Sequence, residues 1–523
     1  MLASSKQPTD IEAAHFLEQA SFGPTDASIA AVKQLGFSAY INSQFAEPVT
    51  VYPILPVVDP SSSKGCPSGS SPYCYRNNYT AFPVQNSFFF NAVTAPDQLR
   101  QRIAFALSQI FVVSNVKVNC AYAIREYQQM IVDNAFGNFR DLLQNVTLNP
   151  AMGDYLDMAN NDKANHSRGT SANENYAREV LQLFTVGLVK LNADGTVQTD
   201  NKGNQIATYT QDNIENFARV FTGWTYPTAP GATAKAHNPK YYVGDMVPVS
   251  ADHDTGSKTL FDGITLPAGL PTDSDLDAAL DAIFNHPNVG PFIGKQLIKF
   301  LVTSNPSPAY VARVTAAFNN NGQGVRGDMK AVIRAILLDN EATGPSTDQG
   351  TFGLLREPVL FITSLLRGLG GRSDGVYLNS QSGALGQPVF DAPTVFNFYT
   401  PDYPLPGDTS GLVAPQFGIQ NTTTTIGRWN FLNSIIYSNI PADSSVAAST
   451  GTSINWSKWL PLANNPDELT QEMDLALTGG VLDNASLNII STVVQTVNSG
   501  DAYGRVRTAA YLIAASSQAM IQR

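Results

Sequence analysis

Residues 154–187, DYLDMANNDKANHSRGTSANENYAREVLQLFTVG, hold the clearest helix signal in this chain. Ser171 and Glu174 have the spacing of a capping box, in which the hydroxyl and the carboxylate accept hydrogen bonds from amides left free at a helix start. We therefore predict a polar helix over 172–187. Its apolar side comprises Tyr176, Val180, Leu183 and Phe184, and its polar stripe comprises Asn175, Arg178, Glu179 and Gln182.

The same periodicity recurs along most of the chain, so the predicted fold is mainly α: a large multi-helix, bundle-like assembly with short β-hairpins. Cap residues at Thr9, Thr25 and Thr210 mark further helix starts. Two long stretches, 225–272 and 370–418, lack a sustained period and are predicted to be irregular loops. The expected division is an N-terminal helical region carrying the polar helix (1–224), a loop excursion (225–272), a second helical region with a loop (273–418) and a C-terminal helical region (419–523).

Composition narrows the range of partners. The chain has 523 residues, 14% of them charged, and a net charge of −11. This balance offers no basic patch for nucleic acid or anionic lipid, so neither is expected. No apolar run reaches the ~18 residues of a membrane span, and the chain opens with the polar MLASSKQPTD instead of a signal peptide. We expect either a protein made without a signal or the mature form of a secreted or periplasmic protein, of undefined oligomeric state.

Three cysteines are too few for a disulfide scaffold. Cys66 and Cys74 flank a loop rich in proline, glycine and serine, which one bridge between them would close. The alternative is a pair of exposed loop thiols. Cys120 is expected to be a buried or free thiol in either case.

Eight segments carry a family resemblance. In order they are HFLEQASFGPT, LRQRIAFALSQIFVVS, NENYAREVLQLFTVG, YTQDNIENFARVFTGW, DHDTGSKTLFDG, HPNVGPFIGKQLIKFLV, REPVLFITSLLRGLG and GQPVFDAPTVFNFY. Together they resemble a large bacterial family catalogued only as a domain of unknown function, the "eighteen hundred" family. The resemblance implies a helix-rich, usually exported bacterial protein and implies no reaction. Phe184 stands where the family pattern has a histidine and Asn397 where it has a glycine, so a role of that histidine in relatives would be missing here.

The polar helix is the first candidate site. Arg178 is expected to hold the neighbouring Glu179 carboxylate ionised, which suits a nucleophile, an electrostatic stabiliser or a metal ligand. Glu174 points about 140° away from Glu179 on the helical wheel, so a partner carboxylate is expected from elsewhere. The alternative is that Arg178 and Glu179 form an ion-pair network tying helices together. Candidate partners are Asp154 and Asp157 before the helix, and Asp252 and Asp254 after it.

The segment ADHDTGSK (251–258) is the second candidate. Asp252, His253 and Asp254 suit a divalent metal, or a histidine base oriented by a carboxylate. Because neighbouring side chains diverge, a metal would need further ligands such as His166 or His237; otherwise the segment is a polar turn. His166, in the loop before the polar helix, is itself a candidate base or ligand, or else an exposed loop residue. A divalent metal is thus allowed but not required, and no metal ligands are assigned.

Aromatic residues border the 225–272 loop. Trp224, Tyr226 and Tyr242 offer stacking faces, and Asn175 and Gln182 offer amides, a combination typical of sites that hold sugars. These five are the predicted substrate-binding residues. The alternative is that the aromatic residues only anchor the loop on the helical core.

The signatures of serine hydrolases, P-loop enzymes, zincins and dinucleotide oxidoreductases are absent from the sequence. The predicted function is an exported bacterial hydrolase or lyase acting on a polysaccharide or related polymer through clustered carboxylates. The alternative is a non-catalytic envelope or surface protein that binds glycan or a protein partner. The predicted catalytic residues are Asp157, His166, Glu174, Arg178, Glu179, Asp252, His253 and Asp254.

Overall fold

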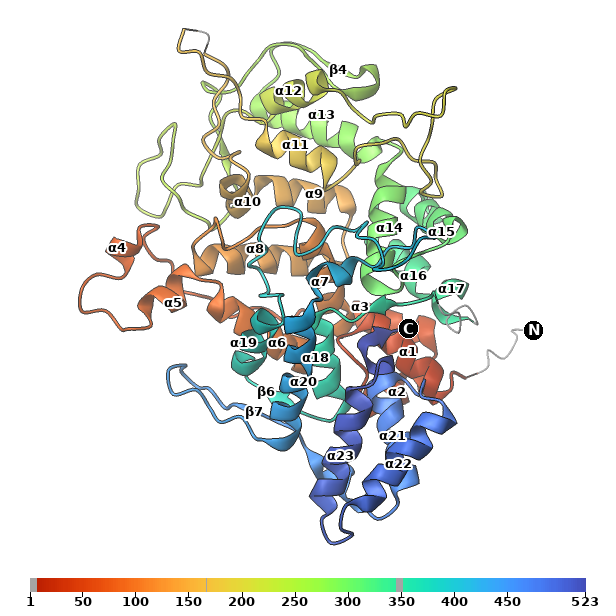
Figure 1. Ribbon diagram of the computed structural model, residues 1–523. Helices are drawn as coiled ribbons and strands as arrows, with labels where there is room; N and C mark the ends of the chain where they lie inside the picture. The colour runs from red at the N-terminus through yellow and green to blue at the C-terminus, as the bar shows by residue number, and fades with distance from the viewer. Residues whose placement is uncertain (1–6, 166, 345–350) are drawn as a thin grey trace.

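Helices form most of the protein. The structure, a computed structural model, describes residues 7–165, 167–344 and 351–523 (Figure 1). In these ranges the helices are joined by loops and by small two-stranded antiparallel sheets. The prediction of a mainly α fold with short β-hairpins is confirmed.

The elements are as follows. The helices of the first half are α1 (Asp10–Ala20), α2 (Asp26–Leu35), α3 (Phe37–Ala46), α4 (Ser62–Gly65), α5 (Cys74–Tyr79), α6 (Phe82–Thr94), α7 (Gln98–Ile110), α8 (Ala121–Asn134), α9 (Phe139–Leu148), α10 (Pro150–Tyr155), α11 (Asn175–Gln182) and α12 (Gln211–Val220). Those of the second half are α13 (Thr272–Asn285), α14 (Val289–Leu301), α15 (Pro308–Asn319), α16 (Met329–Leu337), α17 (Asn340–Thr343), α18 (Pro358–Gly368), α19 (Val376–Ala384), α20 (Thr422–Tyr437), α21 (Pro466–Thr478), α22 (Asn484–Thr496) and α23 (Ala502–Ala514). The sheets pair β1 (Trp224–Thr225) with β2 (Val247–Pro248), β3 (Lys258–Thr259) with β4 (Thr265–Leu266), β5 (Leu354–Leu355) with β8 (Ile521–Gln522), and β6 (Arg372–Ser373) with β7 (Thr452–Ser453). Short 3-10 turns are η1 (Phe261–Gly263), η3 (Pro415–Ile419), η4 (Trp456–Lys458), η5 (Leu460–Leu462) and η6 (Gln518–Met520).

Three helix starts lie where their caps predict them. Thr9, Thr25 and Thr210 each form a complete capping box at the N-terminus of α1, α2 and α12. Each of these boxes joins residues three positions apart, so its signal is local in the sequence. The stretch 370–418, predicted to be irregular, in fact contains the helix α19.

The helices α6 and α7 run through the core. Nearly every residue of α7 is buried, including Arg102, whose guanidinium donates a hydrogen bond to the Phe300 carbonyl at 2.6 Å. Apolar residues surround α6 on most sides, so it lacks an amphipathic stripe and was not among the predicted helices. One hydrophobic core cluster includes residues of all four predicted regions, and the boundaries between those regions stay predictions.

Figure 1 places α9 to α13 at one end of the molecule and α21 to α23 at the other, where α21 packs against α1. Between α11 and α12 an arm of chain folds on itself through bridges at Val189–Ala207, Leu191–Val197 and Thr199–Gln205. This arm, which turns at Asp194–Gly195 and Lys202–Gly203, is one of the short β-hairpins expected in the fold. The loop 225–272 also lies at the α9–α13 end, where it pairs β1 with β2 and β3 with β4.

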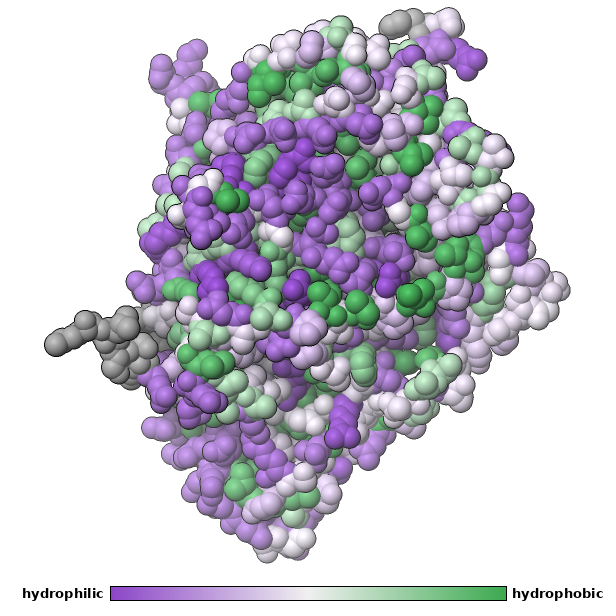
Figure 2. Space-filling model, turned by 180° about the vertical axis from the view of Figure 1, so that it is seen from behind, coloured by the Kyte–Doolittle hydropathy of each residue, from purple (hydrophilic) through white to green (hydrophobic). Residues whose placement is uncertain are grey.

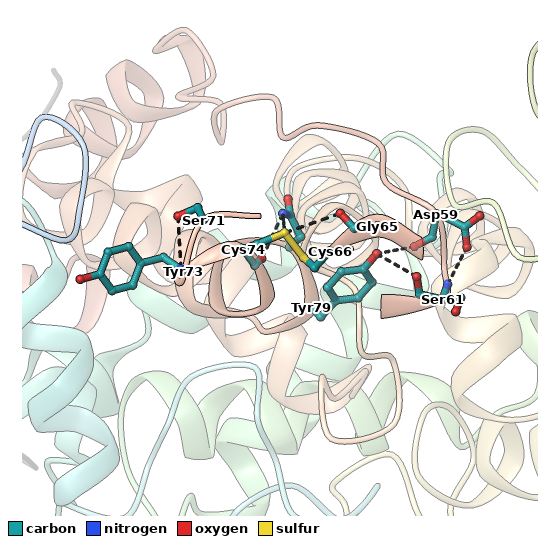
Figure 3. Close-up of a disulfide and its surroundings, with 9 residues drawn as sticks. Asp59, Ser61, Gly65, Cys66, Ser71, Tyr73, Cys74 and Tyr79 are labelled. Atoms are coloured by element: carbon teal, nitrogen blue, oxygen red, sulfur yellow. Dashed lines mark hydrogen bonds between the residues drawn. A yellow bond between two sulfur atoms is a disulfide. The ribbon is translucent and has the colours of Figure 1, made fainter. Parts of the chain in front are cut away.

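A disulfide joins Cys66 and Cys74, with their Cα atoms 5.9 Å apart (Figure 3). The expected bridge across this loop is therefore present, and Cys120 is a buried free cysteine. Beside the disulfide, the Tyr79 hydroxyl donates a hydrogen bond to the Asp59 carbonyl at 2.6 Å. The segment before α6 is thus held by a covalent link and by a buried tyrosine.

The face shown in Figure 2 is mainly hydrophilic, with hydrophobic residues scattered in small groups. In the described ranges, no helix has both the length and the apolar character needed to cross a bilayer.

Candidate functional site

A polar cavity of about 330 Å³ opens between the end of α10, the segment after it and the segment before α11. Three carboxylates stand in its wall, contributed by Asp154, Asp157 and Asp162. Its lining is Gly153, Asp154, Asp157, Ala159, Asn160, Asn161, Asp162, Thr170, Ser171, Asn173 and Tyr226. Most of this lining therefore belongs to the stretch 154–187, in the part that precedes helix α11.

Asp154 is held by three donors from the 225–272 loop. Its carboxylate accepts hydrogen bonds from the Tyr226 hydroxyl at 3.1 Å, the Tyr242 hydroxyl at 2.7 Å and the Lys240 ammonium at 2.8 Å. Burial raises the pKa of both tyrosines, and the negative charge of Asp154 raises it further, so both hydroxyls remain protonated donors. Asp154 is thereby fixed in position at the cavity wall.

The backbone of the cavity wall adopts an uncommon conformation. Asp157 and Asn160 have φ values of 58° and 61°, in the left-handed region that residues other than glycine rarely enter. The Asn160 amide donates to the Trp224 carbonyl at 2.7 Å, and its side-chain oxygen accepts from Thr225 at 2.6 Å. Such strain costs roughly 1–3 kcal/mol per residue and is concentrated at functional sites. At Asn160, the two hydrogen bonds to β1 hold this conformation.

Asp157 projects its carboxylate between two neighbours. One oxygen accepts a hydrogen bond from Lys117 at 2.6 Å, and the other accepts from Asn175 at 3.0 Å. The structure thus joins two predicted site residues, Asp157 and Asn175, at the edge of the cavity. Both groups are partly exposed and remain accessible to a ligand.

A possible cation site adjoins the same cavity. One ligand atom from each of Asp162, His237 and Asp252 lies within 4.8 Å of the others. The His237 Nε2 is 2.7 Å from an Asp162 oxygen, and the second oxygen of Asp252 is buried without a hydrogen-bond partner in the described part of the chain. Two carboxylates and an imidazole are suitable ligands for a divalent cation such as Zn²⁺ or Mn²⁺. The second ligand set that a metal at Asp252 requires is therefore present.

The start of α11 differs from the prediction. The helix begins at Asn175, and Ser171 forms no cap. Instead, the Asn161 side chain accepts a hydrogen bond from the Asn173 amide at 2.8 Å, and the Asn173 side chain accepts one from the Asn175 amide at 2.8 Å. These two hydrogen bonds, accepted by Asn161 and Asn173, replace the capping box. Ser171 is left exposed in the cavity wall.

The polar stripe of α11 pairs differently from the expectation. Arg178 binds Glu174, with 2.9 Å between Nη2 and Oε2, instead of Glu179. Burial raises the pKa of Glu179, an effect that the nearby Arg178 charge only opposes, and one Glu179 oxygen has no partner in the described residues. Arg178 thus lowers the pKa of Glu179 as expected, but the effect of burial is larger. None of Glu174, Arg178 and Glu179 lines the polar cavity, so we leave them out of the proposed site.

His253 and Asp254 belong to a network that fastens the 225–272 loop. His253 Nε2 lies 3.1 Å from Asp275, whose carboxylate also pairs with Lys258 at 2.5 Å, and these three side chains are almost fully buried. Asp254 forms a two-pronged ion pair with Arg219, which lowers the pKa of the carboxyl against the effect of burial. Of the predicted trio, only Asp252 reaches the cavity region.

The remaining predicted residues lie apart from the cavity. Trp224 and Tyr242 are buried in the core and offer no stacking face, although Tyr226 does line the cavity. Gln182, at the C-terminal end of α11, lines a different cavity. His166 falls outside the described residues. Asp162 is not among the predicted catalytic residues, and His237 was expected only as a further metal ligand. The two are 75 residues apart, and only the fold brings them together.

Comparison with known proteins adds the family. A model described as "Protein of unknown function (DUF1800)" matches residues 15–521. The chain belongs to this family. No curated protein and no solved structure matches the chain. The DUF1800 assignment confirms the resemblance seen in the eight segments and adds no reaction.

The two departures from the family pattern have structural explanations. Phe184 is fully buried, with its ring 5.5 Å from that of Phe111, so its position lies in the core of this DUF1800 protein and outside the polar cavity. Asn397 has a φ of 66°, a conformation that glycine adopts freely and that asparagine tolerates better than most residues. The asparagine therefore preserves the backbone shape that a glycine would take.

Proposed function

We propose that the polar cavity is the active site of a hydrolase or lyase acting on a polysaccharide or related hydroxylated polymer. The observation that carries the proposal is the placing of Asp154, Asp157 and Asp162 around one cavity, each with different neighbours. Carboxylates in different environments can divide the tasks of binding and proton transfer. Carboxylates and amides are also the groups that bind sugar hydroxyls, and this wall carries Asn160, Asn161 and Asn173 as well.

His237 is the proposed base. Asp162 accepts a hydrogen bond from one ring nitrogen at 2.7 Å and orients the imidazole, leaving the other nitrogen to take a proton. In hydrolysis that proton comes from the attacking water, and in elimination from a sugar carbon. In both reactions the bond from carbon to the bridging oxygen breaks, and that oxygen leaves as a hydroxyl after taking a proton from the imidazolium. Both side chains are half-exposed, which suits a site open to a polymer. Asp154 and Asp157 would bind substrate hydroxyls.

A divalent cation held by Asp162, His237 and Asp252 is the alternative use of the same side chains. Such a cation would polarise a substrate oxygen or activate a bound water. His237 would then be a ligand instead of a base. The two arrangements predict different metal contents for the purified protein.

Export is part of the proposal. The Cys66–Cys74 disulfide supports it, because disulfides persist in oxidising compartments such as the periplasm and the exterior of the cell. A polymer-degrading enzyme would also meet its substrate there. The test is the redox state of this cysteine pair in protein taken from fractionated cells.

The decisive experiment is a screen of the purified protein against a panel of polysaccharides. New reducing ends report either reaction, and ultraviolet absorbance of an unsaturated product reports elimination alone. His237→Ala and Asp162→Asn should each lower turnover at least a hundredfold, whereas Asp277→Asn, at an exposed ion pair on α13, should not. Elemental analysis of wild type and Asp252→Asn separates the metal arrangement from the histidine base.

Two results would overturn the proposal. Unchanged turnover in both His237→Ala and Asp162→Asn would remove the site assignment. Saturable glycan binding without any cleavage would instead favour the second candidate, a surface protein that binds glycan at the same carboxylates.

A further inference from the structure

A second cavity, of about 550 Å³, lies at the C-terminal end of the α11 helix. Its walls come from α7, α14, the C-terminal end of α11, the 188–205 arm and the loop 395–402. Most of this wall is apolar, in contrast to the carboxylate-lined cavity. Cavities of about 300–1,000 Å³ with mainly apolar walls are typical binding sites for small molecules.

Two of the polar side chains in this cavity carry unpaired donors. Within the described ranges, the side-chain ammonium of Lys295 makes no hydrogen bond or ion pair. The Gln296 side-chain nitrogen is buried without a partner there. Lys299 is already used, since it donates to the Pro401 carbonyl at 2.8 Å and to Asp402 at 2.9 Å. The cavity therefore presents one free ammonium beside one buried amide donor. A buried donor without a partner costs about 1–3 kcal/mol, which a bound acceptor would recover.

Neither of two nearby acidic groups pairs with Lys295. Asp402, in the cavity lining, pairs with Lys299 at 2.9 Å. Asp194 feels the Lys295 charge only weakly, and its carboxylate accepts hydrogen bonds from the Thr196 amide at 3.0 Å and hydroxyl at 2.6 Å. Asp194 is thus engaged in its own turn. The local charge at the cavity favours an anion.

The rim of the cavity is apolar and exposed. Leu188, Val197 and Phe396 line it, with exposed fractions of 57%, 39% and 48%. Large exposed apolar side chains grouped around one opening are characteristic of a binding site for an apolar ligand. The left-handed backbone of Asn397 beside Phe396 helps to shape this wall.

We propose that this cavity binds an amphiphilic monocarboxylate, with its alkyl or aryl part against the apolar walls and its carboxylate at Lys295 and Gln296. The proposal goes beyond the function assigned to the polar cavity and does not depend on it. A carboxylate fits both observations, because it accepts a hydrogen bond from an amide and an ammonium at once. The apolar rim explains why the rest of the ligand would be hydrocarbon.

The test is isothermal titration of the full chain with decanoate below its micelle concentration, and with decanol as the uncharged analogue. We expect saturable 1:1 binding of decanoate, and weaker binding of decanol. Lys295→Gln should weaken decanoate about tenfold and decanol little, whereas Leu188→Asp should weaken both. The matched controls are Lys202→Gln and Ile54→Asp, at exposed positions outside the cavity lining, and both should leave the two affinities unchanged.

Three results would overturn the proposal. They are the absence of saturable decanoate binding, equal affinity for decanoate and decanol in the wild type, and an equal loss of binding in Ile54→Asp and Leu188→Asp. Circular dichroism of each variant identifies any that fail to fold, and Val197→Asp serves as a second rim variant. Loss of polysaccharide turnover in the same variants is not expected, so failure here is distinct from failure of the proposed enzyme.

Discussion

Glu179 is the residue whose environment differs most from what its sequence neighbours indicate. It follows Arg178 directly, yet the Arg178 side chain pairs with Glu174, four residues earlier in the chain. Glu179 is left buried, with one oxygen unpaired in the described part of the chain. Burial disfavours the charged carboxylate and raises its pKa. In the folded state this residue therefore binds a proton more readily than in the unfolded chain.

Replacing Glu179 with glutamine should stabilise the protein at neutral pH by about 1 kcal/mol, near the lower end of the cost of an unpaired buried polar atom. The raised pKa means that wild-type Glu179 contributes stability only below its unfolded pKa and loses it as pH rises through the folded pKa. The advantage of Glu179→Gln should therefore be small at pH 4 and grow towards pH 7. Urea unfolding at the two pH values measures it.

Glu174→Gln is the matched control on the same helix. It breaks a half-exposed ion pair with Arg178, so it should change stability by less than about 0.5 kcal/mol and in the destabilising direction. A Glu179→Gln variant less stable than wild type at pH 7 would show that the carboxylate is satisfied by a group we have not identified.

Single residues of the site could be predicted in part. Asp157 and Asp252 come from local clusters of polar residues, which a sequence displays directly. His237 pairs with Asp162 across 75 residues, and nothing in the loop around His237 indicates that partner. Tyr242 is of a residue type that stacks on sugars, but its hydroxyl donates a hydrogen bond to Asp154. Long-range pairing, which residue type does not encode, decides these cases.

Among the elements, the 225–272 loop depends on a buried charge cluster. The Asp275 carboxylate on α13 accepts hydrogen bonds from Lys258 at 2.5 Å and from His253 at 3.1 Å. Asp275→Asn leaves Lys258 buried without its counter-charge, so the free energy of unfolding should fall by about 3 kcal/mol or more. Asp277→Asn, on the same helix but at an exposed pair with Arg140, should cost under about 1 kcal/mol. Equal losses in urea unfolding would contradict this account.

The segment from α4 to α5 depends on its disulfide. Cys66 and Cys74 are 8 residues apart, and closing so short a loop stabilises a fold by about 2.5 kcal/mol in the chain-entropy description. The double variant Cys66→Ser, Cys74→Ser should be cleaved within 61–79 at least tenfold faster by protease. Dithiothreitol should accelerate cleavage of the wild type and leave the double variant unchanged. A reductant effect on both proteins would place the sensitivity elsewhere.

Elements were predictable where their signals are local. The boxes at Thr9, Thr25 and Thr210 cap helices as expected, whereas Ser171 does not because Asn161 binds the backbone at Asn173. The helix α6 was missed because a helix buried on most sides shows no polar face.

At the scale of the whole molecule, the C-terminal residues pack against segments that are distant in the sequence. The strand β8 pairs with β5, and the Arg356 side chain donates to the Ala519 carbonyl at 3.1 Å while pairing with buried Glu18 near the N-terminus. Gln522 donates to the Leu301 carbonyl at 2.5 Å. Contacts spanning more than 300 residues meet at this point, and no sequence pattern predicts them.

Deleting residues 519–523 should lower the free energy of unfolding by about 3 kcal/mol or more. The backbone amide and the side chain of Arg356 each lose an acceptor carbonyl, and the β5–β8 pair is lost. The loss should appear as a lower midpoint of one cooperative transition in urea. Deleting Arg523 alone keeps the β5–β8 pair and should change the midpoint little. A separate early transition in the truncated chain would instead mean that the C-terminal helices unfold independently.

The short helix α11 connects the two cavities, although only its C-terminal end lines one of them. Asn175 at its first residue touches the polar cavity through Asp157, and Gln182 at its last residue lines the apolar one, roughly 10 Å away along the axis. If one ligand displaces this helix, the affinity for the other ligand changes, and thermodynamic linkage makes the effect reciprocal. If decanoate tightens glycan affinity by some factor, glycan must tighten decanoate affinity by the same factor. The eight residues of α11 are thus the element through which the two proposed sites would influence each other.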